Sequence, residues 1–368
     1  MKVLVTGSTG FIGKNLATQL TVRGDFDILS YNRESTLEDL RLAVEEADFI
    51  CHMAGVNRPD DVAEFARINI GLTETLCQVV QESGRHVPII FASSDHVERN
   101  NLYGTSKLEA EQVLLKHSEK TGVPVYIFRL PRVFGKWCKP DYNSVVATFC
   151  YNIAHDLPIQ VDDAPYPLSL VYIDDLVTAF AQIMVGKEVC KTYCEVQPSY
   201  TISLGELAGQ VRAFRASRDT LVSERVGDGL TRALYATYIS YLSPKDFAYE
   251  VPKYVDPRGV FAEMLKTRDS GQFSFFTAHP GVTRGGHYHH SKTEKFLVVK
   301  GSARFRFRHT LTQEIHEVMT SGDKPEIVET IPGWSHDISN VGDDEMIVML
   351  WANEIFDRDH PDTYADSV

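Results

Sequence analysis

A glycine-rich loop joins the first apolar segment of this chain to its first amphipathic stretch. Residues 2–6 are followed directly by Gly7-Ser8-Thr9-Gly10-Phe11-Ile12-Gly13, which opens the stretch 11–23. Glycine allows a tight turn and a close approach of backbone to ligand, and a helix N-terminus offers free N–H groups to a pyrophosphate. At the start of a βαβ unit, such a loop predicts a dinucleotide site rather than an ordinary turn.

Alternating patterns indicate a parallel sheet in the first half of the chain. Short β-branched runs occur at 2–6, 26–31, 48–52, 87–92 and 125–129. Apolar residues at three- and four-residue spacing occur in 11–23, 60–83 and 103–121. Strands that alternate with helical crossovers form a doubly wound α/β sheet, which we expect to extend to about residue 186.

The pattern changes after about residue 241, where short strands punctuated by Gly, Pro, Asp and Asn replace the helical stretches. These strands are expected at 272–278, 295–299, 303–308 and 345–352, and eight of the 13 histidines lie in the last 90 residues. Ser243-Pro244 and Val251-Pro252 interrupt any helix between the two parts. We therefore predict an N-terminal domain over 1–245 and an all-β barrel or sandwich over 246–368.

Composition excludes several classes of protein. A net charge of −13 opposes the wrapping of nucleic acid, which needs many cations on one face. No apolar run approaches the ~20 residues of a membrane span, and the N-terminus lacks a signal-peptide pattern, so we expect a cytoplasmic protein without membrane contact. The six cysteines are expected to be reduced, buried thiols. Cys190 and Cys194 match half of a metal site, but no second pair follows them.

Further segments downstream of the loop are typical of one enzyme family. They are, in order, His52-Met53-Ala54-Gly55, Asn69, Ser93-Ser94-Asp95, Tyr103-Gly104-Thr105-Ser106-Lys107, Arg129-Leu130-Pro131-Arg132-Val133-Phe134-Gly135 and Val171-Tyr172-Ile173-Asp174-Asp175. With the glycine loop, this series resembles the extended short-chain dehydrogenase/reductase family, and the last two segments resemble its nucleotide-sugar members. The resemblance implies a Rossmann fold with cofactor contacts from Gly7, Ser8, Thr9, Gly10, Phe11, Ile12, Gly13, Asn32, Arg33, Met53, Ala54, Gly55, Asn69, Tyr103 and Lys107.

The end of the second expected strand bears on the choice between NAD and NADP. An Asp or Glu there would bind the ribose hydroxyls of NAD, whereas this chain has Tyr31-Asn32-Arg33. A guanidinium without the carboxylate favours the 2′-phosphate of NADP, so we expect NADPH as the cofactor. The alternative is that Arg33 is only a solvated charge in a loop.

Tyr103 and Lys107 lie four residues apart, on one face of the expected helix. An ammonium beside a phenol favours the phenolate, so Tyr103 could pass a proton to a carbonyl oxygen as hydride reaches its carbon. Ser94 resembles the hydroxyl residue of the family's catalytic triad and would bind the same oxygen. The alternative is that Tyr103 and Lys107 are two exposed side chains on one helix face without a catalytic role. Only eight residues separate Ser94 from Tyr103, fewer than in most extended relatives, which predicts a more open cleft.

Two basic segments are candidates for neutralising a substrate diphosphate. They comprise Arg132, Lys136 and Lys139 in the first, and Arg212, Arg215 and Arg218 in the second. A solvated charged face explains either segment equally well. Asp174 and Asp175 fit the first turn of a helix better than the role of reacting acids.

The C-terminal part contains two histidine motifs. Residues 281–294, followed by Gly301, resemble the first cupin motif, and residues 332–340 resemble the second. His287, His289, Glu294 and His336 would then bind a divalent metal, for which Zn, Fe, Mn and Ni are suitable and zinc is the first expectation. The region also resembles metal-free 3,5-epimerases of 4-keto-6-deoxysugars, in which the residue matching His287 is the base. Those enzymes have Gln at the position of His289. The second histidine in this chain therefore favours a role for His287 as a metal ligand instead of a base.

Together the two halves resemble the CapF-type bifunctional enzymes of capsular polysaccharide synthesis. The resemblance implies that a UDP-linked 4-keto-6-deoxy amino sugar is epimerised at carbon 3 by the cupin and reduced at carbon 4 with NADPH, toward UDP-N-acetyl-L-fucosamine. It also implies a homodimer. One alternative is a 4-epimerase that retains NAD, and another is a monofunctional reductase with a dimerising cupin. A non-enzymatic dinucleotide sensor would typically lack Tyr103.

Overall fold

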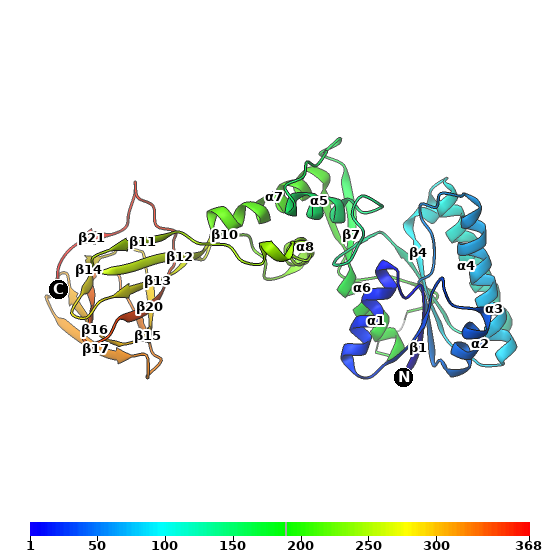
Figure 1. The fold of residues 1–368 in the computed structure, drawn as a ribbon, viewed down its shortest axis with the longest axis horizontal. Coiled ribbons are helices and arrows are strands. Elements are labelled where there is room, and N and C mark those ends of the chain that lie inside the picture. The colour runs from blue at the N-terminus through cyan, green and yellow to red at the C-terminus, as the bar shows by residue number, and fades with distance from the viewer. Residues whose placement is uncertain (188–189) are drawn as a thin grey trace. The chain divides into compact units, whose positions relative to one another are not determined.

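The chain consists of two compact units in the computed structural model, which describes residues 1–187 and 190–368. The first unit comprises Met1–Val211 and Arg232–Leu242, and the second comprises Arg212–Thr231 and Ser243–Val368. Figure 1 shows the course of the chain through each unit. Each unit is described below by itself.

A six-stranded parallel sheet forms the centre of the first unit. Its order is β2-β1-β3-β4-β5-β8, and the strands are β1 (Lys2–Thr6), β2 (Asp27–Tyr31), β3 (Phe49–His52), β4 (Ile89–Ser94), β5 (Val125–Leu130) and β8 (Tyr193–Cys194). All neighbouring strands in this sheet pair in parallel. The sequence-based prediction of a parallel α/β sheet is confirmed, and the carboxyl ends of its strands lie along one edge.

Helices cover both faces of this sheet (Figure 1). One core cluster contains residues of the central strands together with α1 (Phe11–Arg23) and α6 (Ile173–Met184). The opposite core contains residues of α2 (Leu37–Glu46), α3 (Leu72–Ser83) and α4 (Leu102–Thr121). Before α3, η1 (Phe65–Gly71) is a π-helix, so the stretch predicted as one helix changes its hydrogen-bond pattern. α2 begins at a capping box formed by Thr36 and Asp39.

The first unit also has a small mixed sheet and shorter helices. The sheet has the order β6-β7-β9, from β6 (Arg132–Phe134), β7 (Pro167–Tyr172) and β9 (Tyr200–Ser203). The remaining helical elements are η2 (Asp95–Glu98), α5 (Val145–Ala154), α7 (Leu204–Thr220), α8 (Gly229–Ile239) and η3 (Pro244–Asp246), of which α7 and α8 extend across the division between the units and η3 belongs to the second. Asp174 and Asp175 occupy the first turn of α6, as the sequence predicts.

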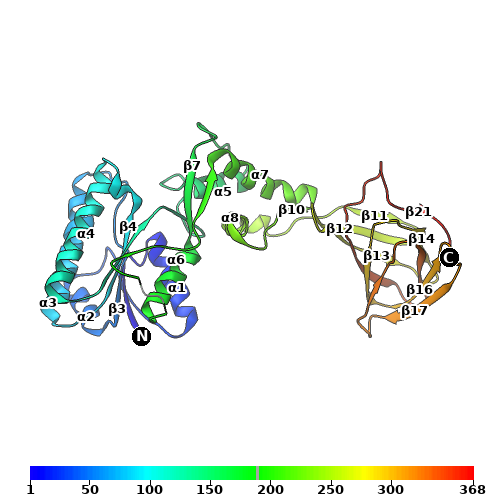
Figure 2. The same cartoon turned by 180° about the vertical axis from the view of Figure 1, so that it is seen from behind.

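The second unit contains two mainly antiparallel sheets, seen in Figure 2. The seven-stranded sheet contains β10 (Val222–Ser223), β11 (Lys253–Asp256), β12 (Gly259–Thr267), β13 (Gly271–Ala278), β20 (Met346–Ala352), β15 (Glu294–Lys300) and β18 (Ile327–Glu329). The five-stranded sheet contains β17 (Ile315–Ser321), β16 (Ser302–His309), β19 (Trp334–Asn340), β14 (Thr283–Tyr288) and β21 (Tyr364–Ala365). One core includes Phe276 and Phe296 from the first sheet with Phe305 and Ile338 from the second. The prediction of an all-β C-terminal region is confirmed.

The expectation of six reduced, buried thiols is wrong for Cys190 and Cys194, which are not reduced, and for Cys138, which is not fully buried. Cys190 and Cys194 form a disulfide, with their Cα atoms 5.6 Å apart. Sequence reasoning rejected a pairing on grounds of cellular compartment, whereas the structure brings Cys190, which precedes β8, together with Cys194, which is the last residue of β8. Of the other four, Cys51, Cys77 and Cys150 are buried and Cys138 is partly exposed. Among the described residues, no helix has the length and apolar character needed to cross a membrane.

Candidate cofactor cleft and metal centre

The glycine loop is closely packed against its surroundings at the end of β1. Gly7 has a left-handed φ of +67°, and its N–H donates to the Tyr31 carbonyl at 2.8 Å. A Cβ at Gly13 would lie 2.2 Å from the Gly7 carbonyl oxygen, and a Cβ at Gly7 would lie 2.8 Å from Ala54. No side chain caps the N-terminus of α1 at Gly10. Its first N–H groups therefore remain available for an anionic ligand.

A cleft of about 1170 Å³ opens above the carboxyl ends of the strands in the first unit. It is lined by the predicted residues Gly7, Thr9, Gly10, Phe11, Ile12, Gly13, Met53, Gly55, Ser94, Tyr103 and Lys107. Ser8 and Asn69 are buried and, like Ala54, are outside the lining. Asn32 and the exposed Arg33 follow β2, also outside it. The structure thus brings the three predicted catalytic residues together with the glycine loop in one cavity.

Asn69 does not line the cleft but is hydrogen-bonded to residues next to it. Its Oδ1 accepts the Val56 N–H at 2.8 Å, and its Nδ2 donates to the Val56 carbonyl at 3.0 Å and to Ser106 Oγ at 2.8 Å. A Cβ at Gly55 would lie 3.2 Å from Asn69 Oδ1 and 3.6 Å from Lys107 Nζ. Asn69 therefore fixes the loop after β3 against α4 and close to Lys107.

α4 carries Tyr103 and Lys107 on consecutive turns. The helix begins at Asn101, whose side chain accepts the Gly104 N–H at 2.8 Å. At Gly104 a Cβ would lie 2.0 Å from the His96 carbonyl oxygen, so only glycine allows α4 to approach η2 this closely. This contact fixes the N-terminal turn of α4, and with it Tyr103, beside the end of β4.

The charge states of Tyr103 and Lys107 differ from those that the sequence predicts. Burial raises the pKa of Tyr103, a hydrogen bond from Ser94 lowers it, and the charge of Asp95 raises it further. Burial also lowers the pKa of Lys107 to about 7, against the opposing charge of Glu111. The Lys107 ammonium lies 4.2 Å from the centre of the Phe91 ring. The sequence predicts that Lys107 lowers the pKa of Tyr103, whereas in the structure the hydrogen bond of Ser94 makes that contribution.

A buried carboxylate follows on the next turn of α4. Glu111 has no exposed side-chain surface and pairs with Arg129, whose Nη2 lies 2.8 Å from Glu111 Oε2. Ser93 Oγ donates to Glu111 Oε1 at 2.5 Å. The Tyr193 ring lies below the Arg129 guanidinium, with 4.6 Å between Cζ and the ring centre. Sequence reasoning missed Glu111, although its position four residues after Lys107 is the available signal.

The two basic segments have different surroundings. Arg132 and Lys139 line the cleft, together with Arg58 and Arg99. Lys136 forms an ion pair with Asp174 at 2.8 Å. In the second segment Arg215 pairs with Asp219 at 3.3 Å, Arg218 donates to the Asp246 carbonyl, and none of the three arginines lines the cleft. Only the first segment therefore contributes cations to the cleft wall.

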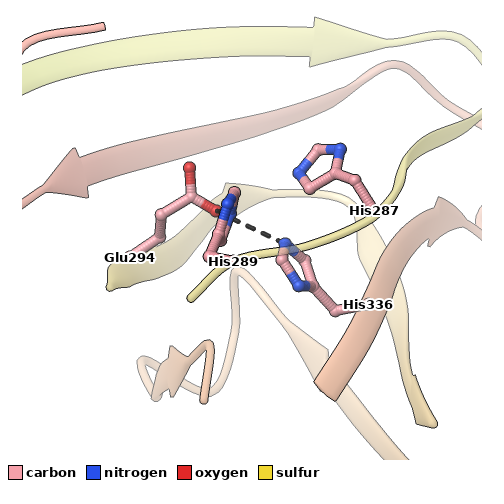
Figure 3. A group of neighbouring side chains, drawn as sticks. All are labelled: His287, His289, Glu294 and His336. Atoms are coloured by element: carbon pink, nitrogen blue, oxygen red, sulfur yellow. Dashed lines mark hydrogen bonds and ion pairs between the residues drawn. The ribbon is translucent and has the colours of Figure 1, made fainter. Parts of the chain in front are cut away.

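The four predicted metal ligands converge in the second unit (Figure 3). One ligand atom of each of His287, His289, Glu294 and His336 lies within 4.8 Å of the others. His287 lies near the end of β14, His289 just beyond it, Glu294 at the start of β15 and His336 in β19. A bulge between Gly285 and His287 interrupts the pairing of β14 with β19, so that His287 lies directly opposite His336.

The donor atoms of this cluster fit a cation. His289 Nδ1 lies 2.5 Å from the Asp362 carbonyl oxygen, which can only accept, so Nδ1 carries the proton. The other ring nitrogen, Nε2, then presents a lone pair 3.2 Å from Glu294 Oε2. His336 Nε2 is buried, with no hydrogen-bond partner among the described residues, and lies 3.4 Å from the same carboxylate oxygen. A divalent ion would satisfy all of these acceptors.

Burial and neighbouring charges keep these groups in the states that a metal requires. Burial, together with the charge of His336, lowers the pKa of His287 to about 4. For Glu294 burial opposes ionisation, but the adjacent imidazoles of His289 and His336 and the nearby Lys292 charge hold its pKa well below the usual range. Lys292 Nζ lies 3.3 Å from Glu294 Oε1 and is almost fully buried. Lys292 and Asp362 were missed from the sequence because Lys292 is not a ligand position of the first histidine motif and Asp362 lies outside both motifs.

The comparisons with known proteins cover both units. Residues 3–193 match the NAD dependent epimerase/dehydratase family, and residues 254–364 match the polysaccharide biosynthesis C-terminal domain. The chain is 57% identical over 368 residues to UDP-2-acetamido-2,6-beta-L-arabino-hexul-4-ose reductase of Pseudomonas aeruginosa, covering 100% of this chain and 99% of that protein.

Solved structures agree with this result. The chain is similar to the capsular polysaccharide assembling protein CapF of Staphylococcus aureus, with a TM-score of 0.93, 41% identity and 100% of both chains covered. UDP-glucuronic acid 4-epimerase of Bacillus cereus, solved with NAD, has a TM-score of 0.56 at 18% identity over 66% of this chain and 98% of that one, and shows the fold alone. The chain therefore belongs to the NAD dependent epimerase/dehydratase family and, with its polysaccharide biosynthesis C-terminal domain, to the CapF-type proteins.

Proposed function

We propose that this protein is an NADPH-dependent reductase of a UDP-linked 4-keto-6-deoxy amino sugar that also epimerises the sugar at carbon 3. The 57% identical relative is a UDP-2-acetamido-2,6-beta-L-arabino-hexul-4-ose reductase, and the term hexul-4-ose denotes a ketone at carbon 4. The observation that carries the reductase assignment is the position of Ser94, Tyr103 and Lys107 in one cleft with the glycine loop. Residues 1–245 would form the reductase domain and residues 246–368 the epimerase-like domain.

In the reductase domain, Tyr103 would donate a proton to the ketone oxygen. Burial raises the pKa of its phenol, so the hydroxyl holds its proton at neutral pH until charge develops on the substrate oxygen. The Ser94 hydroxyl would donate a hydrogen bond to the same oxygen, and the Lys107 ammonium would stabilise the phenolate that remains. Bound NADPH supplies the hydride. Arg58, Arg99 and Lys139 would offset the charge of the substrate diphosphate.

The preference for NADPH rests on the end of β2. Asn32 occupies the position where an acidic residue would bind the ribose hydroxyls, and its Oδ1 accepts the Glu34 N–H at 2.9 Å. Arg33 is exposed and forms no ion pair with any carboxylate in the described part of the chain. It therefore has its full charge to offer a 2′-phosphate.

In the second domain, which we propose to be a cupin barrel, the three histidines and Glu294 would hold a divalent metal, with zinc as the first expectation. A metal in this site supplies a Lewis acid that stabilises negative charge on a substrate oxygen. The ketone at carbon 4 acidifies the hydrogen at carbon 3, so its removal gives an enolate that can be reprotonated on the other face. The same ketone afterwards accepts hydride in the reductase domain. The family resemblance also leads us to expect a cytoplasmic homodimer.

Incubation in heavy water with the UDP-linked 4-keto sugar tests the two activities separately. We expect deuterium at carbon 3 by NMR without NADPH, and NADPH oxidation when it is added. Tyr103→Phe removes the proton donor and should lower NADPH oxidation about 10²- to 10⁴-fold while carbon 3 exchange continues. His336→Ala should stop the exchange but leave reduction of a ketone that is already inverted.

Two outcomes would overturn the proposal. One is a wild-type protein that neither exchanges the carbon 3 proton nor oxidises NADPH with the keto sugar. The other is a folded Tyr103→Phe variant that has lost both activities, which would show that the two steps share one site. Reaction without net NADPH consumption would identify a 4-epimerase that retains NAD, and reduction that His336→Ala leaves unchanged on the uninverted ketone would identify a monofunctional reductase.

A further inference from the structure

Residues close to the end of the chain contact the segments that carry the predicted metal ligands. None of residues 362–366 belongs to the histidine motifs, yet they contact β14, the β14–β15 loop and β19. These are the elements that carry His287, His289 and His336. We refer to residues 362–366 as the C-terminal strap.

Asp362 holds the loop that follows β14 with both its backbone and its side chain. Its carbonyl oxygen accepts from His289 Nδ1 at 2.5 Å. Its carboxylate accepts the backbone N–H groups of His290 at 2.9 Å, Ser291 at 2.7 Å and Lys292 at 2.8 Å, and also the Ser291 hydroxyl at 2.9 Å. These three backbone N–H groups lie in the loop between β14 and β15 and do not pair with another strand. The Asp362 carboxylate therefore supplies the hydrogen-bond acceptors that they need.

The rest of the strap holds the two other histidine positions. β21 pairs with β14, with Ala365 opposite His287 and Tyr364 opposite Tyr288. The Asp366 carboxylate accepts the hydroxyl of Ser335, the residue before His336, and pairs with Arg308 at 2.7 Å. Each of the three imidazoles is therefore fixed directly, or through its neighbour, by a residue of the strap.

Fixing the imidazoles matters because a metal site depends on the orientation and tautomer of its ligands. The carbonyl of Asp362 keeps the proton of His289 on Nδ1, which leaves the lone pair of Nε2, 3.2 Å from Glu294 Oε2, available to a metal ion. The carboxylate of Asp362 also fixes the backbone of Lys292, whose ammonium lies 3.3 Å from the other oxygen of Glu294. One residue from the strap thus orients a histidine ligand and the partner of the carboxylate ligand.

We infer that Asp362 is a positioning residue for the metal centre, and that the C-terminal strap sets the affinity of this centre for its ion. The inference rests on the proposed metal site of the second domain. Loss of a group that orients a ligand typically weakens metal binding about 10- to 100-fold, and we expect this range for Asp362→Ala. The backbone carbonyl remains in that variant, so deletion of residues 362–368 should weaken binding further.

The affinity of the full-length protein for Zn²⁺ can be measured by competition with a chromophoric chelator. Asp357→Ala is a matched control, because the Asp357 carboxylate lies in the same C-terminal segment but, among the residues that the structure describes, accepts only from Asp359 and His360. Co²⁺ substitution adds a second readout, since its visible spectrum reports ligand geometry. We expect the spectrum of Asp362→Ala to differ from that of wild type and the spectrum of Asp357→Ala to match it.

The possible results separate the inference from the proposal on which it rests. A folded Asp362→Ala variant with wild-type Zn²⁺ affinity and Co²⁺ spectrum would overturn the positioning role alone. If wild-type protein binds neither ion, the metal site itself fails and the inference fails with it. Should Asp362→Ala not fold, Ser335→Ala tests the strap through Asp366, and unchanged affinity in that folded variant would refute the role of the strap.

Discussion

Glu111→Gln removes one negative charge from the interior of the first unit. The Glu111 side chain is 0% exposed and receives hydrogen bonds from Arg129 Nε, Arg129 Nη2 and Ser93 Oγ, with Tyr193 Oη at 3.5 Å. Gln keeps one acceptor oxygen but brings an NH₂ group toward the donors that surround it. Arg129 and Ser93 therefore lose part of their pairing in a region that water reaches poorly.

The magnitude follows from the burial of the two partners. Breaking a buried ion pair by removing one partner costs about 3–5 kcal/mol. The Arg129 side chain is 33% exposed, so water partly screens the guanidinium that is left. With one acceptor retained, we expect Glu111→Gln to lower the free energy of unfolding of the first unit by about 2 kcal/mol.

Urea unfolding followed by circular dichroism, with hydrogen exchange at amides of β4 and β5, measures this loss in the first unit. Glu109→Gln is the matched control, because Glu109 is exposed on the same helix and its change should stay within about 0.5 kcal/mol. Equal stability of the two variants would refute the reasoning that the Glu111 pair contributes to the fold. An altered urea dependence in Glu111→Gln would indicate that the variant changes the unfolded or native ensemble instead.

Three further predictions concern pH, the glycine loop and the metal. Burial lowers the pKa of Lys107 to about 7, so its ammonium is present below that pH and lost above it. The kcat/KM for NADPH-dependent reduction should therefore fall above about pH 7. The Lys107→Met variant has no ammonium to lose, so its reduction should be slow at every pH and should show no such fall. Gly13→Ala adds a Cβ 2.2 Å from the Gly7 carbonyl and should weaken NADPH binding about tenfold or more in a fluorescence titration. Gly209→Ala, with open space for its Cβ, should leave binding unchanged. Zn²⁺ at 1,000 times its Kd should stabilise the second unit by about 4 kcal/mol in thermal unfolding, and a chelator or His336→Ala should remove that shift.

Sequence periodicity and spacing were sufficient for features that depend on neighbours along the chain. The strand–loop–helix order around Gly7 and Gly13 predicts the first βαβ unit, because strand and helix periods are local properties of the backbone. The four-residue spacing of Tyr103 and Lys107 predicts their shared helix face for the same reason. The motif around His287 likewise predicts a cluster that the structure assembles.

Contacts between distant segments were decided only by the tertiary structure. Glu111 meets Arg129 because α4 packs beside β5, and Asp362 reaches His289 across 73 residues because β21 pairs with β14. The charge states also depend on this packing, since burial raises the pKa of Tyr103 where neighbouring residues in the chain suggested that it would be lowered. Sheet order, register and exclusion of water are set by the whole fold, and for that reason no local pattern in the sequence specifies them.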